Sequence, residues 1–217
     1  LERQGTDHWA ATTAQGQRIQ ARQVLLATNG YTDGLWPGLA RTVLAANSFI
    51  VATQPLGKAG AHILPGGETG STSQRLLLYF RKDAQGRLLM GGRGHFADPQ
   101  GAGDYAHLER AVALMFPGLG PLQYEYRWAG RIAVTRDFMP HLHQPAPGIT
   151  MALGYNGRGI AMATLLGREA AVLMAGGNAP ACPFPVTPVQ PIPLHGLQRL
   201  YIAAGVAWYS LLDRLGA

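Results

Sequence analysis

The chain has 217 residues, of which 47% are hydrophobic and only 14% are charged, so it can bury a core and is not globally disordered. Its net charge of +6 reflects only 12 acidic residues; the arginines are scattered, which argues against a nucleic-acid partner. The single cysteine, Cys182, excludes a disulfide scaffold and a multi-cysteine zinc site. No apolar run is long enough for a membrane span, and we expect a cytoplasmic protein.

Strand patterns dominate the first part of the chain. Residues 8–13 and 17–20 flank Ala-Gln-Gly and predict a β-hairpin. The apolar run 23–27 is typical of a buried parallel strand and leads into Thr28-Asn29-Gly30. Residues 47–53 predict a further strand that stops before Pro55.

The middle of the chain combines another hairpin with a helix. Residues 76–80 and 88–90 are separated by a four-residue turn, 83–86, and predict two paired strands. Residues 104–116 have apolar side chains at helical spacing and end at Pro-Gly. Residues 124–134 alternate as a strand does.

The last part of the chain contains a strand, a glycine turn and a helix in direct succession. Residues 149–153 are an apolar strand, and residues 160–174 predict a helix closed by Gly-Gly. The six prolines within 179–193 predict an extended connector, and 194–215 predicts an amphipathic helix weakened by Gly205. With α/β patterns at each end and a β-rich block between, we expect a mixed α/β protein in which one domain interrupts another.

The glycine turn Gly154-Tyr155-Asn156-Gly157-Arg158-Gly159 carries the clearest chemical signal. Glycines allow a tight turn and close approach of a ligand, and the start of the next helix offers unpaired N–H groups with partial positive charge. A phosphate or the carbonyl edge of a flavin fits such a site. The alternative is a strand-to-helix turn without a ligand.

Other motifs favour structural roles. The segment 92–97 fits G-x-G-x-x-A, but no helix follows it, so we interpret it as the end of a hairpin. His141 and His143 could share one face of a strand, but no carboxylate pair or cysteine completes a metal site, so we expect none. Aromatic residues of the middle block are expected in the core or in a pocket wall: Tyr79, Phe80 and Trp128.

Three stretches resemble one known family: residues 21–32, residues 126–140 and residues 154–164. They resemble the DAO-type FAD-dependent oxidoreductases, with γ-glutamylputrescine oxidoreductase-like enzymes as the most similar branch. The resemblance implies an FAD-binding domain interleaved with a β-rich substrate domain. It assigns 1–41 and 147–177 to the FAD-binding domain and 42–146 to the substrate domain. The remainder, 178–217, would be a proline-rich connector and a C-terminal helix.

The resemblance also implies the cofactor contacts. The glycine turn would lie against the isoalloxazine ring, and Thr28, Asn29 and Gly30 would lie nearer the ADP half. The ring contacts implied are Gly154, Tyr155, Asn156, Gly157, Arg158, Gly159 and Ile160. The helix start would stabilise negative charge at the flavin N1–C2 edge. Cys182 lies outside these motifs, so we expect a non-covalent flavin.

The family's G-x-G-x-x-G unit, which holds the FAD pyrophosphate, is not contained in these residues. We therefore expect the C-terminal half of a flavoenzyme that needs its N-terminal FAD-binding half, and we expect the 217 residues alone to bind FAD weakly and to be inactive. A non-catalytic fragment, or a subunit that completes its FAD site with another chain, is the alternative.

A second departure concerns the substrate. Family members that oxidise amino acids carry an arginine two positions after the glycine of Trp-x-Gly, and this position is Ile132 here. The resemblance then favours an amine, as in polyamine catabolism, oxidised by hydride transfer to flavin N5 to an imine and then an aldehyde. Oxygen or another acceptor would reoxidise the flavin. No catalytic residue is assigned; the substrate-contact candidates are Arg93, His95 and Tyr155.

Overall fold

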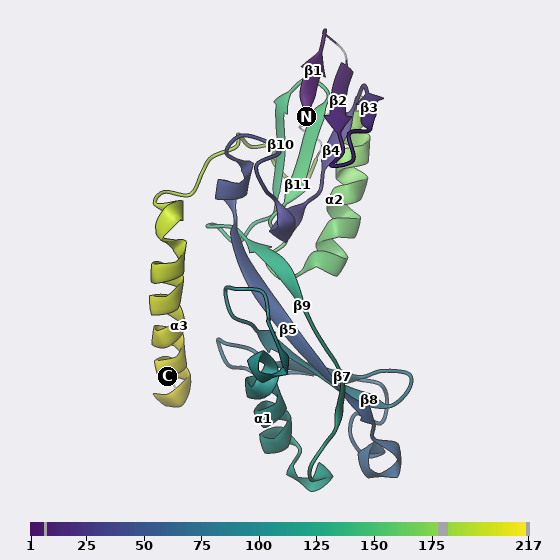
Figure 1. The fold of residues 1–217 in the computed structure, drawn as a ribbon, viewed down its shortest axis with the longest axis vertical. Helices are drawn as coiled ribbons and strands as arrows, with labels where there is room; N and C mark the ends of the chain where they lie inside the picture. Colours follow the sequence, from purple (N-terminus) through teal and green to yellow (C-terminus); the bar gives the residue numbers. More distant parts are fainter. Residues whose placement is uncertain (7, 178–181, 216–217) are drawn as a thin grey trace. The chain divides into compact units, whose positions relative to one another are not determined.

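The computed structural model describes residues 1–6, 8–177 and 182–215. The chain forms two compact units, and each unit is assembled from two separate segments of sequence. The first unit comprises 1–45 and 132–196, and the second comprises 46–131 and 197–217. Helices and strands are mixed throughout, which confirms the predicted class (Figure 1).

The first unit contains two small sheets. The first sheet consists of β1 (Glu2–Gln4), β2 (His8–Thr12) and β3 (Arg18–Ala21), and the second of β4 (Val24–Leu26), β10 (His141–Ala146) and β11 (Ile149–Leu153). Strands β2 and β3 pair in antiparallel fashion, which confirms the first predicted hairpin. Strand β11 lies between β10 and β4 and runs parallel to β4, which confirms the predicted parallel strand.

Helix α2 (Gly159–Met174) covers one face of the β10-β11-β4 sheet (Figure 1). Because side chains alternate along a strand, Leu142 and Ala152 share the face that packs against Leu166 and Ala170 of α2. His141 and His143 therefore lie on the opposite face, whose strand partners Leu153 and Met151 belong to a separate core. That core consists of Trp9, Leu26, Leu39, Val43, Ala133, Ile149, Met151 and Leu153.

The described part of the proline-rich segment, 182–193, is extended, as predicted; residues 178–181 lie outside the described range. The N–H of Thr187 donates to the carbonyl of Leu142 (2.9 Å). Further along, the N–H of Ile192 donates to the carbonyl of Arg41 (2.8 Å), next to the short helix η2 (Leu39–Thr42). The segment is therefore fastened to the first unit at both ends.

A five-stranded sheet organises the second unit. Its strands, in the order β6-β7-β8-β5-β9, are β6 (Thr69–Ser71), β7 (Tyr79–Lys82), β8 (Arg87–Arg93), β5 (Leu44–Pro55) and β9 (Tyr124–Val134). The pairing of β7 with β8 confirms the second predicted hairpin. Helix α1 (Ala106–Met115) covers one face, and its Leu108 and Val112 are completely buried. The core there consists of Phe49, Val51, Ile63, Leu88, Met90, Tyr105, Leu108 and Val112.

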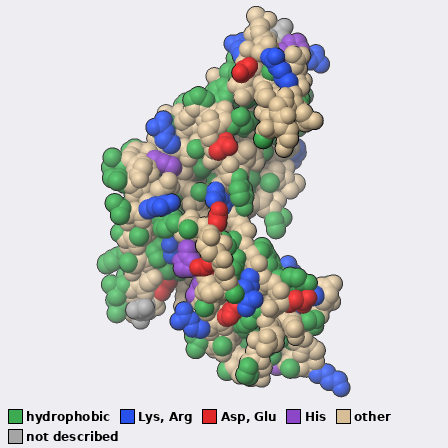
Figure 2. Space-filling model, in the orientation of Figure 1, with side chains coloured by type: hydrophobic (Ala, Val, Ile, Leu, Met, Phe, Trp, Pro, Cys, Tyr) green, Lys and Arg blue, Asp and Glu red, His purple; other side chains and the backbone are tan. Residues whose placement is uncertain are grey.

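The predicted terminal helix is α3 (Gln198–Leu215), and it belongs to the second unit. The carboxylate of Asp213 fixes it by accepting hydrogen bonds from the N–H groups of Arg75 (3.1 Å) and Leu76 (3.2 Å). One stripe of α3 is apolar and open to solvent (Figure 2), with Leu200 69% and Trp208 58% exposed. Other members of the stripe are Tyr201, Leu211 and Leu215, and the exposed Leu197 lies just before the helix. None of the helices in the described ranges has the length and apolar character needed to cross a bilayer.

The boundaries of the two units and those of the predicted domains do not coincide, and the first unit already extends to residue 45 instead of 41. Residues 132–146 join the first unit rather than the central block, because β10 pairs with β11. The predicted tail 178–217 is divided between the units at residue 196, because the proline-rich segment bonds to the first unit and α3 to the second. Assignment of the units to cofactor and substrate remains a prediction.

The core of the second unit can be tested with two leucines of the same helix. We expect Leu108→Ala to lower the free energy of unfolding by about 2–5 kcal/mol, because it leaves a cavity beneath the sheet. Leu114, which is 82% exposed, provides the control, and Leu114→Ala should change stability by less than about 0.5 kcal/mol. Urea unfolding followed by tryptophan fluorescence measures both, and equal losses would contradict the assignment of Leu108 to the core.

Candidate functional site

Two turns that the sequence predicts as cofactor contacts meet in the first unit. Asn29, in the short helix η1 (Asn29–Tyr31), has a left-handed backbone with φ of 46°. Its side-chain Oδ1 accepts hydrogen bonds from the backbone N–H groups of Gly154 (3.0 Å) and Tyr155 (3.5 Å). The end of β4 and the glycine turn after β11 are therefore joined directly.

The other two residues of the first turn have local roles. Thr28 Oγ1 lies 2.7 Å from Thr32 Oγ1, which donates to the carbonyl of Asn29 at 2.7 Å. Gly30 is buried inside the turn. The turn is a short 3-10 element that its own threonine side chains close.

Asn156 forms a second link, between the glycine turn and the end of β9. Its Oδ1 accepts from the N–H of Thr135 (2.9 Å), and its Nδ2 donates to the carbonyl of Gly154 (2.6 Å). Its own N–H donates to the carbonyl of Ala133 (3.0 Å). Because this residue is left-handed (φ of 52°), asparagine suits both its backbone and its side-chain bonds.

Gly154 and Gly157 both have positive φ, 80° and 81°, but only Gly154 is crowded. A Cβ at Gly154 would overlap Cγ2 of Thr135, whereas a Cβ at Gly157 would meet no atom within 4 Å. The glycine at 154 therefore lets two chain segments touch, and the glycine at 157 leaves open space beside the turn.

The turn presents an uncapped helix start. The side chain of Arg158, the residue before α2, does not cap the helix, so within the described part of the chain the first N–H groups have neither a cap bond nor an intrahelical partner. Ile160, in the first turn, is 96% exposed, and Arg158 is also exposed. Free donors, a positive helix end and open space at Gly157 fit the electron-rich edge of a flavin. Glycines with room beside them would let such a planar group approach the backbone.

Tyr155 occupies a different environment from the one that substrate contact would require. It is buried, its ring packs with Leu166 and Ala170, and its hydroxyl donates to the carbonyl of Ala152 (3.2 Å). Burial raises the pKa of this hydroxyl. The geometry favours a packing role for Tyr155 over the predicted substrate contact.

The other two substrate candidates, Arg93 and His95, lie together in the second unit. They line a cavity of about 350 Å³ that also has His107 and Arg110 in its wall. Nδ2 of Asn47 donates to the carbonyls of His95 and Ala97 (both 2.9 Å) and holds this loop in place. Burial lowers the pKa of Arg93, and the wall of the cavity carries the guanidinium groups of Arg93 and Arg110 together with the carboxylate of Asp104.

Sequence reasoning missed a second cavity in this unit, of about 290 Å³, on the sheet face opposite α1. Tyr79, Arg81 and Trp128 contribute to its wall, which agrees with the prediction of core or pocket-wall positions for the two aromatic residues. The Tyr79 ring lies over Gly91 of the neighbouring strand, where a Cβ would overlap it, and its hydroxyl is 2.6 Å from Oγ of Ser48. The cross-strand Tyr–Gly pair is the signal that sequence could have offered.

His141 and His143 share one strand face, with ring centroids 5.5 Å apart. Within the described ranges, no three His, Cys, Asp or Glu side chains come together as a metal site. His143 is buried, which lowers its pKa, and its Nδ1 donates to the carbonyl of Thr187 (2.7 Å). Cys182 is a free thiol that packs against the core beneath α2.

The crowding at Gly154 gives a test with an internal control. We expect Gly154→Ala to destabilise the protein more than Gly157→Ala, because both incur about 1–2 kcal/mol of left-handed strain but only the first also clashes. Thr135→Ser removes Cγ2 and keeps the hydroxyl, so it should recover part of the loss in the Gly154→Ala background. Thermal unfolding of Gly154→Ala, Gly157→Ala, Thr135→Ser and the double variant of 154 and 135 measures this. Equal effects at the two glycines would refute the contact.

Comparison with known proteins places these features in a family. The family model "FAD dependent oxidoreductase" (DAO) matches residues 1–173. The chain is 33% identical to "Probable oxidoreductase OrdL" of Rhizobium meliloti (strain 1021), over 90% of this chain and 46% of that protein. It is also 33% identical to "Gamma-glutamylputrescine oxidoreductase" of Escherichia coli (strain K12), over 94% of this chain and 48% of that protein.

Solved structures show the same fold. Glycine oxidase from Geobacillus kaustophilus superposes with a TM-score of 0.64 at 22% identity, over 82% of this chain and 48% of that one. Iminodiacetate oxidase from Chelativorans sp. BNC1 gives a TM-score of 0.63 at 16% identity, over 84% and 49%. The chain spans about half the length of the curated relatives it matches. By its family match and by these relatives, the chain belongs to the DAO family of FAD-dependent oxidoreductases.

Proposed function

We propose that this chain forms part of an enzyme that oxidises the C–N bond of an amine of the γ-glutamylputrescine type, with non-covalently bound FAD. The observation that carries the proposal is the 33% identity to the E. coli gamma-glutamylputrescine oxidoreductase over 94% of this chain. The position that would clamp an α-carboxylate in amino-acid oxidases of the family is Ile132. The neighbouring Arg131 is engaged elsewhere, through a two-bond pairing with Asp98 (2.5 and 3.1 Å).

The first unit offers the cofactor contacts. The open backbone at Gly157 and the uncapped start of α2 would hold the electron-rich edge of the flavin ring, with Ile160 at its side. Asn29 would act indirectly, because its side chain holds the glycine turn in position. When bound, FAD supplies an acceptor for two electrons from the substrate.

The second unit offers chemistry that suits a long amine with a distal carboxylate. Tyr79 and Trp128 give an aromatic wall against which methylene groups would pack. Arg93, His95 and Arg110 line the other cavity of this unit, together with Asp104, and its two guanidinium groups would pair with a carboxylate. The amine loses two electrons and a proton at its α carbon, and water hydrolyses the resulting imine to an aldehyde and ammonia. Oxygen or another acceptor would take up the electrons.

The function is tested with protein expressed from its complete coding sequence. Under anaerobic conditions γ-glutamylputrescine should bleach the flavin absorbance and release ammonia, whereas glycine should not. Faster bleaching by glycine would contradict the amine assignment. Protein that folds but retains no flavin would instead support a non-catalytic fragment, or a subunit dependent on another chain.

The helix start is tested with Ile160→Glu. A carboxylate there places negative charge beside the flavin edge, and we expect FAD affinity to fall roughly fivefold or more. Ile160→Gln is the matched neutral control and should bind FAD as the wild type does. Fluorescence titration with FAD measures both, and thermal unfolding verifies that the glutamate variant is folded. Equal affinity of the two variants would remove the helix start from the cofactor site.

A further inference from the structure

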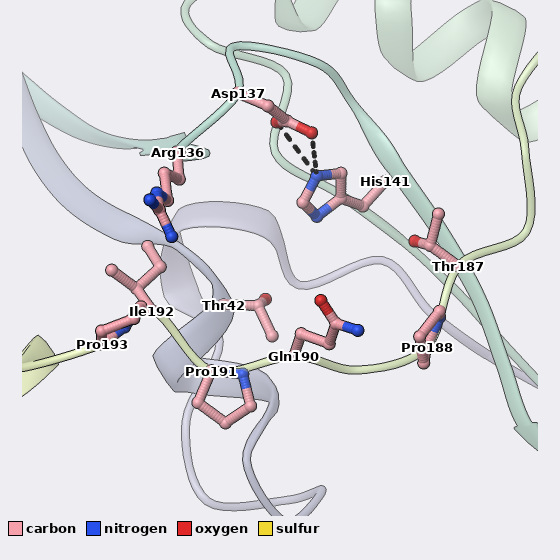
Figure 3. Close-up of a pocket in the computed structure, with 10 residues that line it drawn as sticks. All are labelled: Thr42, Arg136, Asp137, His141, Thr187, Pro188, Gln190, Pro191, Ile192 and Pro193. Carbon is pink, nitrogen blue, oxygen red and sulfur yellow. Dashed lines mark hydrogen bonds and ion pairs between the residues drawn. The ribbon is translucent and has the colours of Figure 1, made fainter.

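A cavity of about 340 Å³ in the first unit is not used by the proposed reaction (Figure 3). Its wall comes from three separate segments: η2, the turn after β9 with the start of β10, and the proline-rich segment. The lining residues used below are Thr42, Arg136, Asp137, His141, Pro191 and Ile192. A space of this size accommodates a small metabolite.

The wall is built before any ligand arrives. Thr187 is bonded to Leu142 at one end of the proline-rich wall, and Ile192 to Arg41 at the other. His195 adds a third anchor, from Nε2 to the carbonyl of Val43 (2.9 Å). Prolines between the anchors restrict the backbone further. Little conformational entropy of this wall would therefore be lost when a ligand binds.

The cavity wall carries a guanidinium group, that of Arg136, and a carboxylate, that of Asp137, which do not pair with each other. Arg136 is exposed and makes no ion pair with any residue in the described ranges. Asp137 accepts instead from the N–H of Met139 (3.1 Å) and from Nε2 of His141 (3.1 Å). Burial opposes ionisation of Asp137, but these hydrogen bonds hold its pKa below the usual value.

His141 positions the carboxylate of Asp137. Its Nε2 lies 3.1 Å from Oδ1 of Asp137, and its Nδ1 is buried without a hydrogen-bond partner among the described residues. In Figure 3 the His141 ring lies beside the cavity, next to the carboxylate of Asp137. Solvent does not reach Nδ1, so His141 serves the cavity by holding the carboxylate of Asp137, whose side chain is 57% exposed.

We propose that this cavity binds a small zwitterionic amino acid. Arg136 takes the carboxylate, and the carboxylate of Asp137, held in place by His141, takes the ammonium group. Pro191 and Ile192 contact an aliphatic side chain. An anion alone would leave its negative charge beside Asp137, and an amine alone would leave Arg136 unpaired, so neither complements both charges.

The test uses three molecules of one shape and protein expressed from its complete coding sequence. L-Leucine carries both charges, 4-methylpentanoate lacks the ammonium group, and 3-methylbutylamine lacks the carboxylate. Isothermal calorimetry under anaerobic conditions should show leucine binding at least roughly tenfold more tightly than either analogue, because each analogue forfeits one charged hydrogen-bonding group. Flavin absorbance recorded alongside separates binding from oxidation, which belongs to the proposed reaction.

Variants locate the binding. Arg136→Gln and His141→Phe should each weaken leucine binding roughly tenfold, whereas Arg18→Gln, an exposed arginine on β3, should not. Thermal unfolding verifies that the variants are folded, and Arg136→Gln is informative even if His141→Phe unfolds because its side chain is exposed. The proposal is overturned if leucine gives no binding heat, if Arg136→Gln binds it as tightly as wild type, or if 4-methylpentanoate binds equally well.

Discussion

The carboxamide oxygen of Asn29 accepts a hydrogen bond from the N–H of Gly154, 125 positions away in sequence. The carboxamide oxygen of Asn156 accepts one from the N–H of Thr135. Backbone N–H groups withdrawn from water need such partners, and in an irregular turn no neighbouring strand provides them. These two side chains therefore substitute for a sheet ladder at the point where β11 ends. The open turn at Gly157 and the uncapped helix start depend on this arrangement, because it fixes where α2 begins.

Sequence patterns recovered most of the regular structure because local periodicity determines it. The two hairpins, α1, α2 and α3 all lie where the spacing of apolar residues and the turn residues predicted them. The burial of Tyr155 could not be predicted from the glycine-rich turn, because its ring packs into the core beneath α2 through tertiary contacts. The unit boundaries were displaced because the pairing of β10 with β11 is a tertiary contact that periodicity does not report.

The cavities were beyond sequence reasoning for a related reason. The wall around Arg136 depends on long-range bonds such as that of Ile192 to Arg41, whereas the proline-rich pattern predicted an extended segment without indicating its partner. The face of the five-stranded sheet around Tyr79 was predictable only in part. Alternation indicates that Tyr79 and Phe80 point to opposite sides, but the packing of α1 decides which side is buried. The periodicity of the sequence thus predicts the helices and strands, whereas the cavities depend on long-range contacts.

The hydrogen bonds of Asn29 and Asn156 also bear on how function can be inferred for related proteins. Both side chains are committed to backbone groups, so a protein that shares these motifs shares a loop conformation, whichever molecule it oxidises. Shared turn motifs therefore indicate which cofactor a protein binds, but they say little about its substrate. Distinguishing one relative from another requires the residues that face open space, such as Tyr79, Trp128 and Arg93.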